Sequence, residues 1–558
     1  NRRNIPVKLD GASTHAFSTS FYLAQEYEFG KTRQEIKITE KKANNSNAKL
    51  KGKKNVDDFE DGFNPLQKKV KLEPELPGFD ISERSYEYKI SSKPLKLEYE
   101  KPSIRPLALP EDELESIKST YLKFGYGLPN AFTGELALGK MKGDFSSSFA
   151  LRHNSASNKD IVNQKFLTNA LDFVIANTFE NELKLNANAF MNIDYFNLYG
   201  IVAAADTTKQ NLSPQRRLMH WDVSAALKRD EITNSMSASI GIRHQFMHNN
   251  IEGVNAHMVR PSLDVHLDLY PDFSLIIPVY STIAFSNFQQ KASLVGIKPV
   301  FRFSRPFFRL ELGADAFYDD KFKIHPEAYV GLNKLFKFLD IFAGVNSEAF
   351  INTIYNKGIE NPFMLFASDD FRTSVIESYY GGVRADVEGA KIEFITEYRL
   401  LENLHMFVPS AVDDRQFDMM YDNGKDLAIK GMFSYNITSN ITLSGDLVKH
   451  FYTMDTVEKA WHHPDFEASF TSQLSFLNNK LLVDGSLFFK SGLFYPDVNQ
   501  QAVSLPVLFD ISGRVQYKLI DNFSVFLEWN NITATKYNRW YQYPSYRVHL
   551  LAGIKAQF

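Results

Sequence analysis

The chain has 558 residues, a net charge of −3 and no cysteine. The lack of cysteine excludes disulfides and thiolate metal sites, and the near-neutral charge gives no reason to expect a nucleic-acid partner. Aromatic residues make up 14% of the chain, yet mean hydropathy is only −0.29. No run approaches the roughly 18 apolar residues of a membrane-spanning helix, but membrane-spanning strands need only about 9–11 residues of alternating polarity.

Residues 1–114 differ in composition from the remainder. A basic, Asn-rich run covers 37–55, an acidic patch follows at 57–61, and Pro-containing pieces come next. The basic run has too few apolar residues to offset the entropy of ordering, which favours a solvated linker over a partner-binding segment. We expect 1–114 to be a largely irregular extension in the periplasm or the lumen. Within it, Tyr86–Leu97 alternates well enough to add to a sheet edge or to lie inside the lumen.

From about Glu115 onward, apolar and polar residues alternate in 22 segments, from Ser119–Gly127 to Tyr546–Phe558. The links after even-numbered segments are short and the links after odd-numbered segments are often long, as Gly200–Arg217 is. Outer-membrane barrels show this alternation of periplasmic turns and external loops. The pattern predicts an all-β protein, in which residues 115–558 form a transmembrane antiparallel β-barrel of about 22 strands with both termini periplasmic.

The closing segment shows the two faces of such a strand. Successive side chains of a strand point to opposite faces, and one face of this segment is apolar throughout. These residues are predicted to face the membrane: Tyr546, Val548, Leu550, Ala552, Ile554, Ala556 and Phe558. The chain ends on the aromatic Phe558, as expected for a strand that closes an outer-membrane barrel.

Charged residues fall on one face of the clearest strands, and this face is assigned to the lumen. A charge on the lipid face near the midplane would cost about 2–4 kcal/mol. The lumen-facing residues are predicted to include Lys184, Asn186, Asn188, Asp510, Arg514, Lys518, Arg547 and Lys555. A soluble tandem sandwich or propeller would instead need sequence repeats or domain linkers, and neither is seen after residue 115.

Aromatic residues cluster just before the closing strand. The cluster comprises Trp529, Tyr537, Trp540, Tyr541 and Tyr543. An interfacial aromatic belt explains it without any ligand; stacking on sugars is the alternative.

The same stretch resembles the C-terminus of TonB-dependent outer-membrane receptors. The matching residues are Asn531, Ile532, Thr533, Tyr537, Trp540, Tyr541, Tyr543, Pro544 and Phe558. The opening pair, YLKFGYGLPNAFTGELALG from Tyr121, is similar to the first hairpin of a plug-lacking subgroup of that family. The resemblance implies a 22-stranded barrel in the outer membrane.

The family's N-terminal plug, with its Gly-rich strands and TonB-contacting peptide, has no counterpart in residues 1–114. Barrels of this size are normally plugged, so something else must fill the lumen. The candidates are residues 1–114, an inward-folded loop such as Phe350–Arg372 or Glu402–Lys425, or another protein.

Several polar groups are candidate sites. His462-His463, near Asp465 and Glu467, could bind a metal, but an external loop or strand start is favoured because no third ligand stands at a fixed spacing. A solvated lumen wall explains His450 with Asp446. Three acidic pairs could hold Ca²⁺, but soluble loops explain them as well: Asp319-Asp320, Asp369-Asp370 and Asp413-Asp414. No nucleophile motif is present. The sequence predicts neither an enzyme nor a cofactor.

Two functions follow as hypotheses for an integral protein of the outer membrane of a Gram-negative bacterium. The first is transport across, or assembly at, the outer membrane by a receptor-like barrel without a plug. The alternative is a non-conducting accessory subunit of a multi-protein machine for outer-membrane protein assembly or secretion. The expected partners are outer-membrane lipids, including lipopolysaccharide, and other outer-membrane or periplasmic proteins.

Overall fold

The computed structural model describes residues 119–200, 214–233, 235–288, 291–367 and 371–558. The predicted extension 1–114, with its segment Tyr86–Leu97, lies outside the described residues. The described residues are mostly antiparallel strand, and α3 (Ile354–Glu360) is a short helix. Within this part of the chain, no helix is long and apolar enough to cross a membrane.

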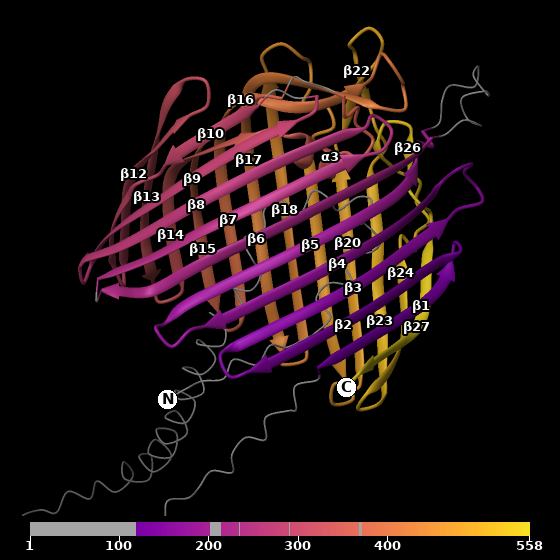
Figure 1. The fold of residues 1–558 in the computed structure, drawn as a ribbon, viewed down its shortest axis with the longest axis horizontal. Coiled ribbons are helices and arrows are strands. Elements are labelled where there is room, and N and C mark those ends of the chain that lie inside the picture. Colours follow the sequence, from indigo (N-terminus) through magenta and orange to yellow (C-terminus); the bar gives the residue numbers. More distant parts are fainter. Residues whose placement is uncertain (1–118, 201–213, 234, 289–290, 368–370) are drawn as a thin grey trace, which may run out of the picture. The chain divides into compact units, whose positions relative to one another are not determined.

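The strands of the first half are β1 (Thr120–Leu128), β2 (Ala131–Lys142), β3 (Phe145–Ser157), β4 (Lys165–Thr178), β5 (Leu183–Asn197), β6 (Gln215–Thr233), β7 (Met236–Asn249), β8 (Val254–Tyr270), β9 (Phe273–Ser286), β10 (Ala292–Ile297), β11 (Val300–Arg305), β12 (Phe308–Tyr318) and β13 (Phe322–Leu335). Apart from β10 and β11, which both pair with β9 and β12, each strand pairs with its neighbours in sequence, so the sheet is a continuous meander (Figure 1).

The second half comprises β14 (Leu339–Ile351), β15 (Thr373–Val387), β16 (Ala390–Pro409), β17 (Phe417–Thr438), β18 (Ile441–Met454), β19 (Phe466–Phe476), β20 (Leu481–Ser491), β23 (Leu508–Ile520), β24 (Phe523–Asn530) and β27 (His549–Gln557). Two small hairpins stand apart from the main sheet: β21 (Phe494–Pro496) with β22 (Ala502–Ser504), and β25 (Asn538–Trp540) with β26 (Tyr543–Pro544).

The sheet closes on itself, because β1 pairs with β27 from Tyr121↔Gln557 to Leu128↔Leu550. The main sheet has 23 segments, but β10 and β11 both pair with β9 and β12 and act as one interrupted strand. Pro299 lies at the interruption and has no N–H to donate to a ladder. The result is the closed barrel of 22 antiparallel strands that the sequence predicts.

The two faces of β1 show how alternation fits this closure. Leu122, Phe124 and Tyr126 are exposed on the outside of the barrel, whereas Tyr121 and Lys123 are buried on the inside. An outer surface of exposed apolar side chains suits a hydrocarbon environment, and full closure leaves no unpaired strand edge in it.

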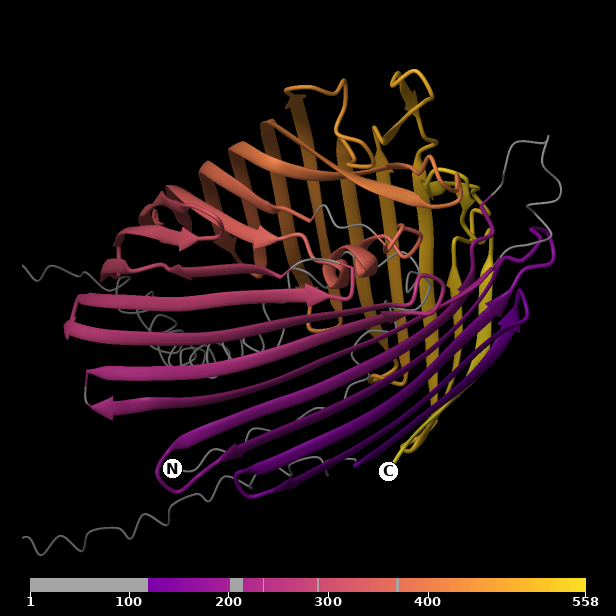
Figure 2. The same cartoon turned by 45° about the horizontal axis from the view of Figure 1, so that its top comes forward.

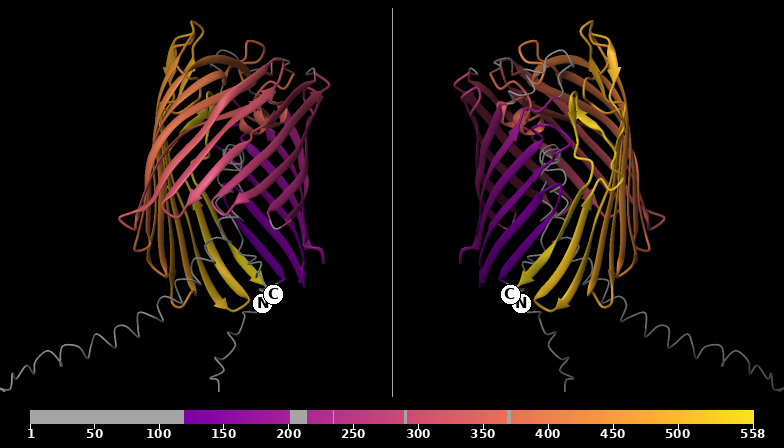
Figure 3. Two further views of the ribbon diagram at one scale, coloured as in Figure 1. Left: turned by 90° about the vertical axis from the view of Figure 1, so that its left-hand side faces the viewer. Right: turned by 90° about the vertical axis from the view of Figure 1, so that its right-hand side faces the viewer.

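The links differ at the two ends of the barrel. At the end where the C-terminus lies, tight turns such as 143–144, with Gly143 at φ 61°, connect the strands. At the opposite end, here called the loop end, the links are long and α3 lies inside the ring of strands (Figures 2 and 3).

One loop prediction needs correction. The sequence interpretation treated Glu402–Lys425 as a loop, but β16 continues to Pro409 and β17 begins at Phe417. The pairing from Leu404↔Asp422 to Pro409↔Phe417 extends the hairpin beyond a register shift after Leu401. The shift interrupts the regular alternation, which is why the sequence pattern stops there while the backbone pairing continues.

The closing seam is held by one aromatic ring and one buried ion pair on the lumen side. Gly125 and Gly553 face each other across β1 and β27. A Cβ added to Gly125 would lie only 2.9 Å from the Phe526 ring, and one added to Gly553 only 2.6 Å from it. The Phe526 ring therefore fills the space that the two glycines leave. Lys123 Nζ lies 4.7 Å from the centre of that ring and 2.7 Å from Glu528 Oε1.

Replacement of Lys123 by Met should lower the free energy of unfolding by about 3 kcal/mol, because it leaves the buried Glu528 carboxylate without its closest cation. Lys184→Met is the matched control, since its ion pair with Asp230 is largely exposed and worth about 0–1 kcal/mol. Urea unfolding of the barrel in lipid vesicles measures both. Equal losses for the two variants would contradict a special role for the seam.

Candidate functional site

The segment from Asn352 to Phe366 folds into the barrel at its loop end. Its helix α3 begins after Thr353, whose side-chain oxygen accepts a hydrogen bond from the backbone N–H of Asn356 at 3.1 Å. A helix of seven residues has little stability alone. Almost all of its residues are buried, so packing against the barrel stabilises it.

Around this segment lies an apolar core, here called the loop-end cap. It draws on the last residues of β5, the loop-end parts of β6, β7 and β8, the segment 352–366, the extended β16–β17 hairpin and the stretch before β27. Its buried members are Phe196, Leu198, Tyr199, Leu218, Met247, Val254, Ala256, Met258, Ile354, Tyr355, Phe363, Met364, Phe366, Phe407, Phe417, Trp540 and Tyr543.

Phe363 is the central ring of the cap. It stacks on Tyr543 with ring centres 3.6 Å apart and meets the edge of Phe196 at 5.5 Å. Tyr543 also donates a hydrogen bond to the carbonyl of Arg415 at 2.6 Å. Segments nearly 350 residues apart in sequence are thus joined in one core, in which each fully buried large apolar side chain contributes about 1.5–3 kcal/mol.

Arg216 anchors the inward segment to the barrel wall. This side chain is fully buried, and its Nη1 donates to the carbonyls of Pro362 and Met364, both at 2.8 Å. Its Nη2 pairs with Glu252 at 2.7 Å. Three charge-assisted contacts at Nη1 and Nη2 offset much of the cost of burying this guanidinium, whose Nε has no hydrogen-bond partner among the described residues.

A second polar contact joins α3 to the extended hairpin. Glu360 Oε2 accepts from Lys357 Nζ at 2.8 Å and from His405 Nε2 at 2.9 Å, and all three side chains are buried. Burial raises the pKa of Glu360, but the contacts with His405 and Lys357 outweigh it and hold that pKa well below its ordinary value. Glu360 is therefore a buried carboxylate that fixes the helix to β16.

His462 and His463 lie in the link between β18 and β19 and also support the hairpin. His462 Nδ1 donates to the carbonyl of Phe407 and His463 Nε2 to that of His405, each at 2.8 Å. Burial lowers the pKa of His462 to about 3 and that of His463 to about 4. Among the described residues no group of three or more His, Cys, Asp or Glu side chains is placed to hold a metal ion.

The aromatic residues before the closing strand are placed differently from the sequence interpretation. Trp540 and Tyr543 lie in the loop-end cap, and Tyr537 is buried beside Leu508 and donates to Asp510. Tyr541 stacks on Tyr495 at 4.0 Å. The prediction of an interfacial aromatic belt is wrong for these four residues, because the stretch packs against other loops of the protein and does not continue a barrel strand.

Trp529 is the member of that group that lies in a barrel strand. It belongs to β24 and alternates with the buried Glu528, so it shares the outer face with Val525 and Leu527.

Most of the residues predicted to face the lumen contact another side chain of the barrel. Arg514 pairs with Asp484, Lys184 with Asp230, and Lys518 with Asp521. Asn188 accepts from Ser224, Asp510 accepts from Ser512, and Lys555 lies over the Tyr121 ring at 5.1 Å. Asn186 is exposed on β5, and Arg547 is exposed between β26 and β27.

The closing strand begins later than the sequence interpretation placed it. In β27, Leu550, Ala552, Ile554 and Ala556 are paired with the outward residues of β1, from Leu128↔Leu550 to Leu122↔Ala556. Val548 and Phe558 flank the strand. Tyr546 lies before it, where its hydroxyl donates to the carbonyl of Gln164 at 3.2 Å and its ring meets Phe166, so protein groups surround it.

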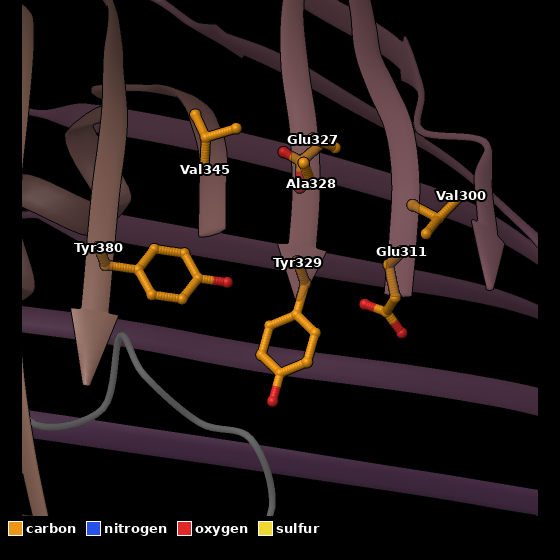
Figure 4. Close-up of a pocket in the computed structure, with 7 residues that line it drawn as sticks. All are labelled: Val300, Glu311, Glu327, Ala328, Tyr329, Val345 and Tyr380. Carbon is orange, nitrogen blue, oxygen red and sulfur yellow. The ribbon is translucent and has the colours of Figure 1, made fainter. Parts of the chain in front are cut away.

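The barrel wall also contains a small polar cavity of about 50 Å³ beside the interruption between β10 and β11. It is lined by Val300, Glu311, Glu327, Ala328, Tyr329, Val345 and Tyr380, from β11 to β15 (Figure 4). Lys298 pairs with Glu327, and Arg302 with Glu311. This volume suits a few water molecules, so the cavity is part of the wall and the loop-end cap remains the candidate site.

Several cap residues escaped the sequence interpretation. Arg216 falls in the predicted link Gly200–Arg217, although β6 already begins at Gln215, and Lys357 and Glu360 read as charges of the loop Phe350–Arg372. Only the spacing of three between Lys357 and Glu360 hints at a helix turn, and nothing local indicates that His405 completes the cluster.

Comparisons with known proteins place the fold. No family model and no curated protein matches the chain. Among solved structures, the FrpB iron transporter from Neisseria meningitidis matches 79% of this chain and 81% of its own, with a TM-score of 0.63 and 11% identity. The ferric-catecholate import receptor Fiu from E. coli K12 matches 79% and 82%, with a TM-score of 0.58 and 9% identity.

The pyoverdine receptor FpvA from Pseudomonas aeruginosa PAO1 also matches, over 79% of this chain and 78% of its own, with a TM-score of 0.60 and 11% identity. The resemblance to the barrel of TonB-dependent outer-membrane receptors is thereby confirmed at the level of the fold. At such identities the likeness concerns the fold alone.

Arg216→Met should loosen the cap, because it leaves the Glu252 carboxylate and the carbonyls of Pro362 and Met364 without their buried donor. Backbone hydrogen exchange in 354–366 should rise at least about tenfold, the factor that 1.4 kcal/mol gives. Arg217→Met is the control, since Arg217 is exposed on the opposite face of β6. Unchanged protection in the Arg216 variant would contradict the anchoring role.

Acid should open the link that carries His463. The pKa of this histidine is about 4 when buried and about 6.5 when solvated, so an open link takes up a proton that the closed link does not. The closed form is therefore fully stable above about pH 6.5 and loses stability as the pH falls toward 4. His463→Gln retains a donor for the His405 carbonyl and cannot titrate, so its pH dependence should be weaker.

Tryptophan emission reports this change, because Trp461 is buried next to His462. The wild-type emission should shift to the red as the pH falls from about 7 to about 4.5, and the variant should shift less. Identical pH profiles would contradict the assignment.

Proposed function

We propose that this chain is an integral outer-membrane barrel that acts in transport, without a globular plug, and that the loop-end cap controls passage through it. The fold shared with an iron transporter and with siderophore receptors supports a role in transport, but it does not identify what is transported. The absence of plug signatures in 1–114 supports the plug-less form.

The observation that carries this proposal is the position of the cap. A barrel of 22 strands encloses a wide lumen that needs a filling. Here the filling at the loop end is built from the barrel's own loops, and Phe363, Met364 and Phe366 lie in its core. A solute that enters from the loop end must displace the segment 352–366 or pass beside it, so the cap is placed to act as a gate.

The orientation follows from the two ends of the barrel. Long links characterise the external side of outer-membrane barrels and short turns the periplasmic side. The loop end would therefore face outward, and Phe558, which bonds to Thr120 at the turn end, would face the periplasm together with the start of β1. We therefore propose that the C-terminus and the entry of the chain into β1 lie on the periplasmic side.

A second candidate is the non-conducting accessory subunit of an outer-membrane assembly or secretion machine. Two hairpin tips at the loop end support it: Val412, between β16 and β17, is 81% exposed, and Val498, between β21 and β22, is 97% exposed. Exposed apolar tips on long loops are suited to protein contacts. In this case the cap would be a permanent closure.

Conductance of the purified barrel in planar bilayers distinguishes the two functions. The cap-less variant replaces 353–365 with a short Gly-Ser linker, and it is prepared with and without residues 1–114. A matched variant shortens the β21–β22 hairpin at 498–500, which lies outside the cap core. Heat-modifiable migration on gels verifies that each barrel is folded.

We expect the cap-less barrel without 1–114 to conduct ions and the hairpin variant to remain as closed as the intact protein. A folded cap-less barrel that does not conduct after removal of 1–114 would contradict a transport role and favour the accessory subunit.

A further inference from the structure

The outer wall of the barrel carries an unusual group of side chains near the loop end of β6 to β9. Trp221, Phe246, His257 and Phe285 lie side by side on four adjacent strands, since the register pairs Trp221↔Phe246, Phe246↔His257 and His257↔Phe285. His244 completes the group, which we call the wall cluster. It shares the outer face with Ile240 and Ile242 of β7, which are 59% and 54% exposed.

The rings of the wall cluster are in direct contact. Trp221 stacks on Phe246 with centres 4.0 Å apart, and His257 stacks on Phe285 at 5.0 Å and on His244 at 5.6 Å. An aromatic layer at the boundary of the hydrocarbon region is a common anchor. Two histidines within such a layer are not needed for anchoring, because an imidazole is more polar than the residues beside it.

A hydrogen-bond relay fixes the protons of both histidines. The indole N–H of Trp221 can only donate, so the Nδ1 of His244, 3.3 Å away, is an acceptor. The proton of His244 must then be on Nε2, which lies 3.3 Å from Nδ1 of His257 and donates to it. His257 consequently carries its own proton on Nε2. Both rings are neutral, and the relay ends in an N–H donor on the outer wall.

Polarity increases from the wall cluster toward the loop end. Two residues beyond Phe246 on the same face, His248 bonds to Asn255 at 2.9 Å. Arg217 is exposed on the same face of β6, four residues from Trp221, or about 13 Å along the strand. Within the described residues, neither the Arg217 guanidinium nor Nε2 of His257 has a hydrogen-bond acceptor.

We propose that the wall cluster and Arg217 form a binding site for the phosphate-bearing headgroup of a lipid in the outer leaflet. The acyl chains lie against Ile240 and Ile242, Nε2–H of His257 donates to a headgroup oxygen, and Arg217 binds the phosphate. Arginine and phosphate make strong, charge-assisted contacts, and a neutral imidazole donor avoids the cost of a charge at the edge of the hydrocarbon layer. This site rests on the outward orientation of the loop end proposed above, but it does not depend on what the lumen does.

Native mass spectrometry of the detergent-solubilised full-length barrel tests this site with two probes, diphosphoryl and monophosphoryl lipid A. The test variant is Arg217→Gln with His257→Phe, which keeps the ring that stacks on Phe285. The control is Lys228→Gln, which removes a cation from the lumen face of the same strand. Heat-modifiable migration verifies folding of each protein.

We expect the wild type and the Lys228 variant to bind the diphosphoryl form more tightly than the monophosphoryl form. The test variant should bind the diphosphoryl form about tenfold more weakly, as expected for the loss of one charge-assisted contact. Unchanged binding in the test variant, an equal loss in the Lys228 control, or full displacement of the lipid by inorganic phosphate would overturn the proposal.

Discussion

The structure depends on backbone closure. In a membrane no water is available to strand edges, so each N–H and C=O of a spanning strand must find a partner in the sheet. The pairing of β1 with β27 meets this requirement, and the side chains at the seam explain how two short strands are held together. Gly125 and Gly553 make room for the ring of Phe526, and Lys123 pairs with Glu528 above it.

Closure at 22 strands creates the second constraint, a lumen too wide for the side chains of the wall to fill. At the loop end the protein meets it with material from its own loops. The inward segment contributes Phe363, the stretch before the closing strand contributes Tyr543, and Arg216 of the wall binds the carbonyls that end the segment. The cap is therefore a small hydrophobic core inside a membrane barrel, and its buried polar groups are fixed by ion pairs and backbone contacts.

The sequence predicted the barrel well because a strand's two faces are recorded locally, in residues two apart. The number of strands and the closing strand follow from that pattern. The cap could be anticipated only as one of several ways to fill the lumen, because its contacts join positions far apart in the chain. Arg216 looks like one more charge in a predicted loop, and its partners lie at 252, 362 and 364. The sequence pattern predicts a membrane belt for Trp540 and Tyr543, since aromatic residues of an interface and of a buried core look alike in sequence.

The measurement that tests the central claim most directly is cysteine labelling from outside intact cells, because the natural chain has no cysteine. A membrane-impermeant maleimide would be applied to cells that express either Ile354→Cys or Val412→Cys. Ile354 is fully buried in the cap, and Val412 lies exposed at the tip of the extended hairpin. The loop-end cap predicts rapid labelling at 412 and protection at 354. Equal labelling at both positions would show that the cap is not closed in the membrane. Labelling at neither position would contradict the outward orientation of the loop end.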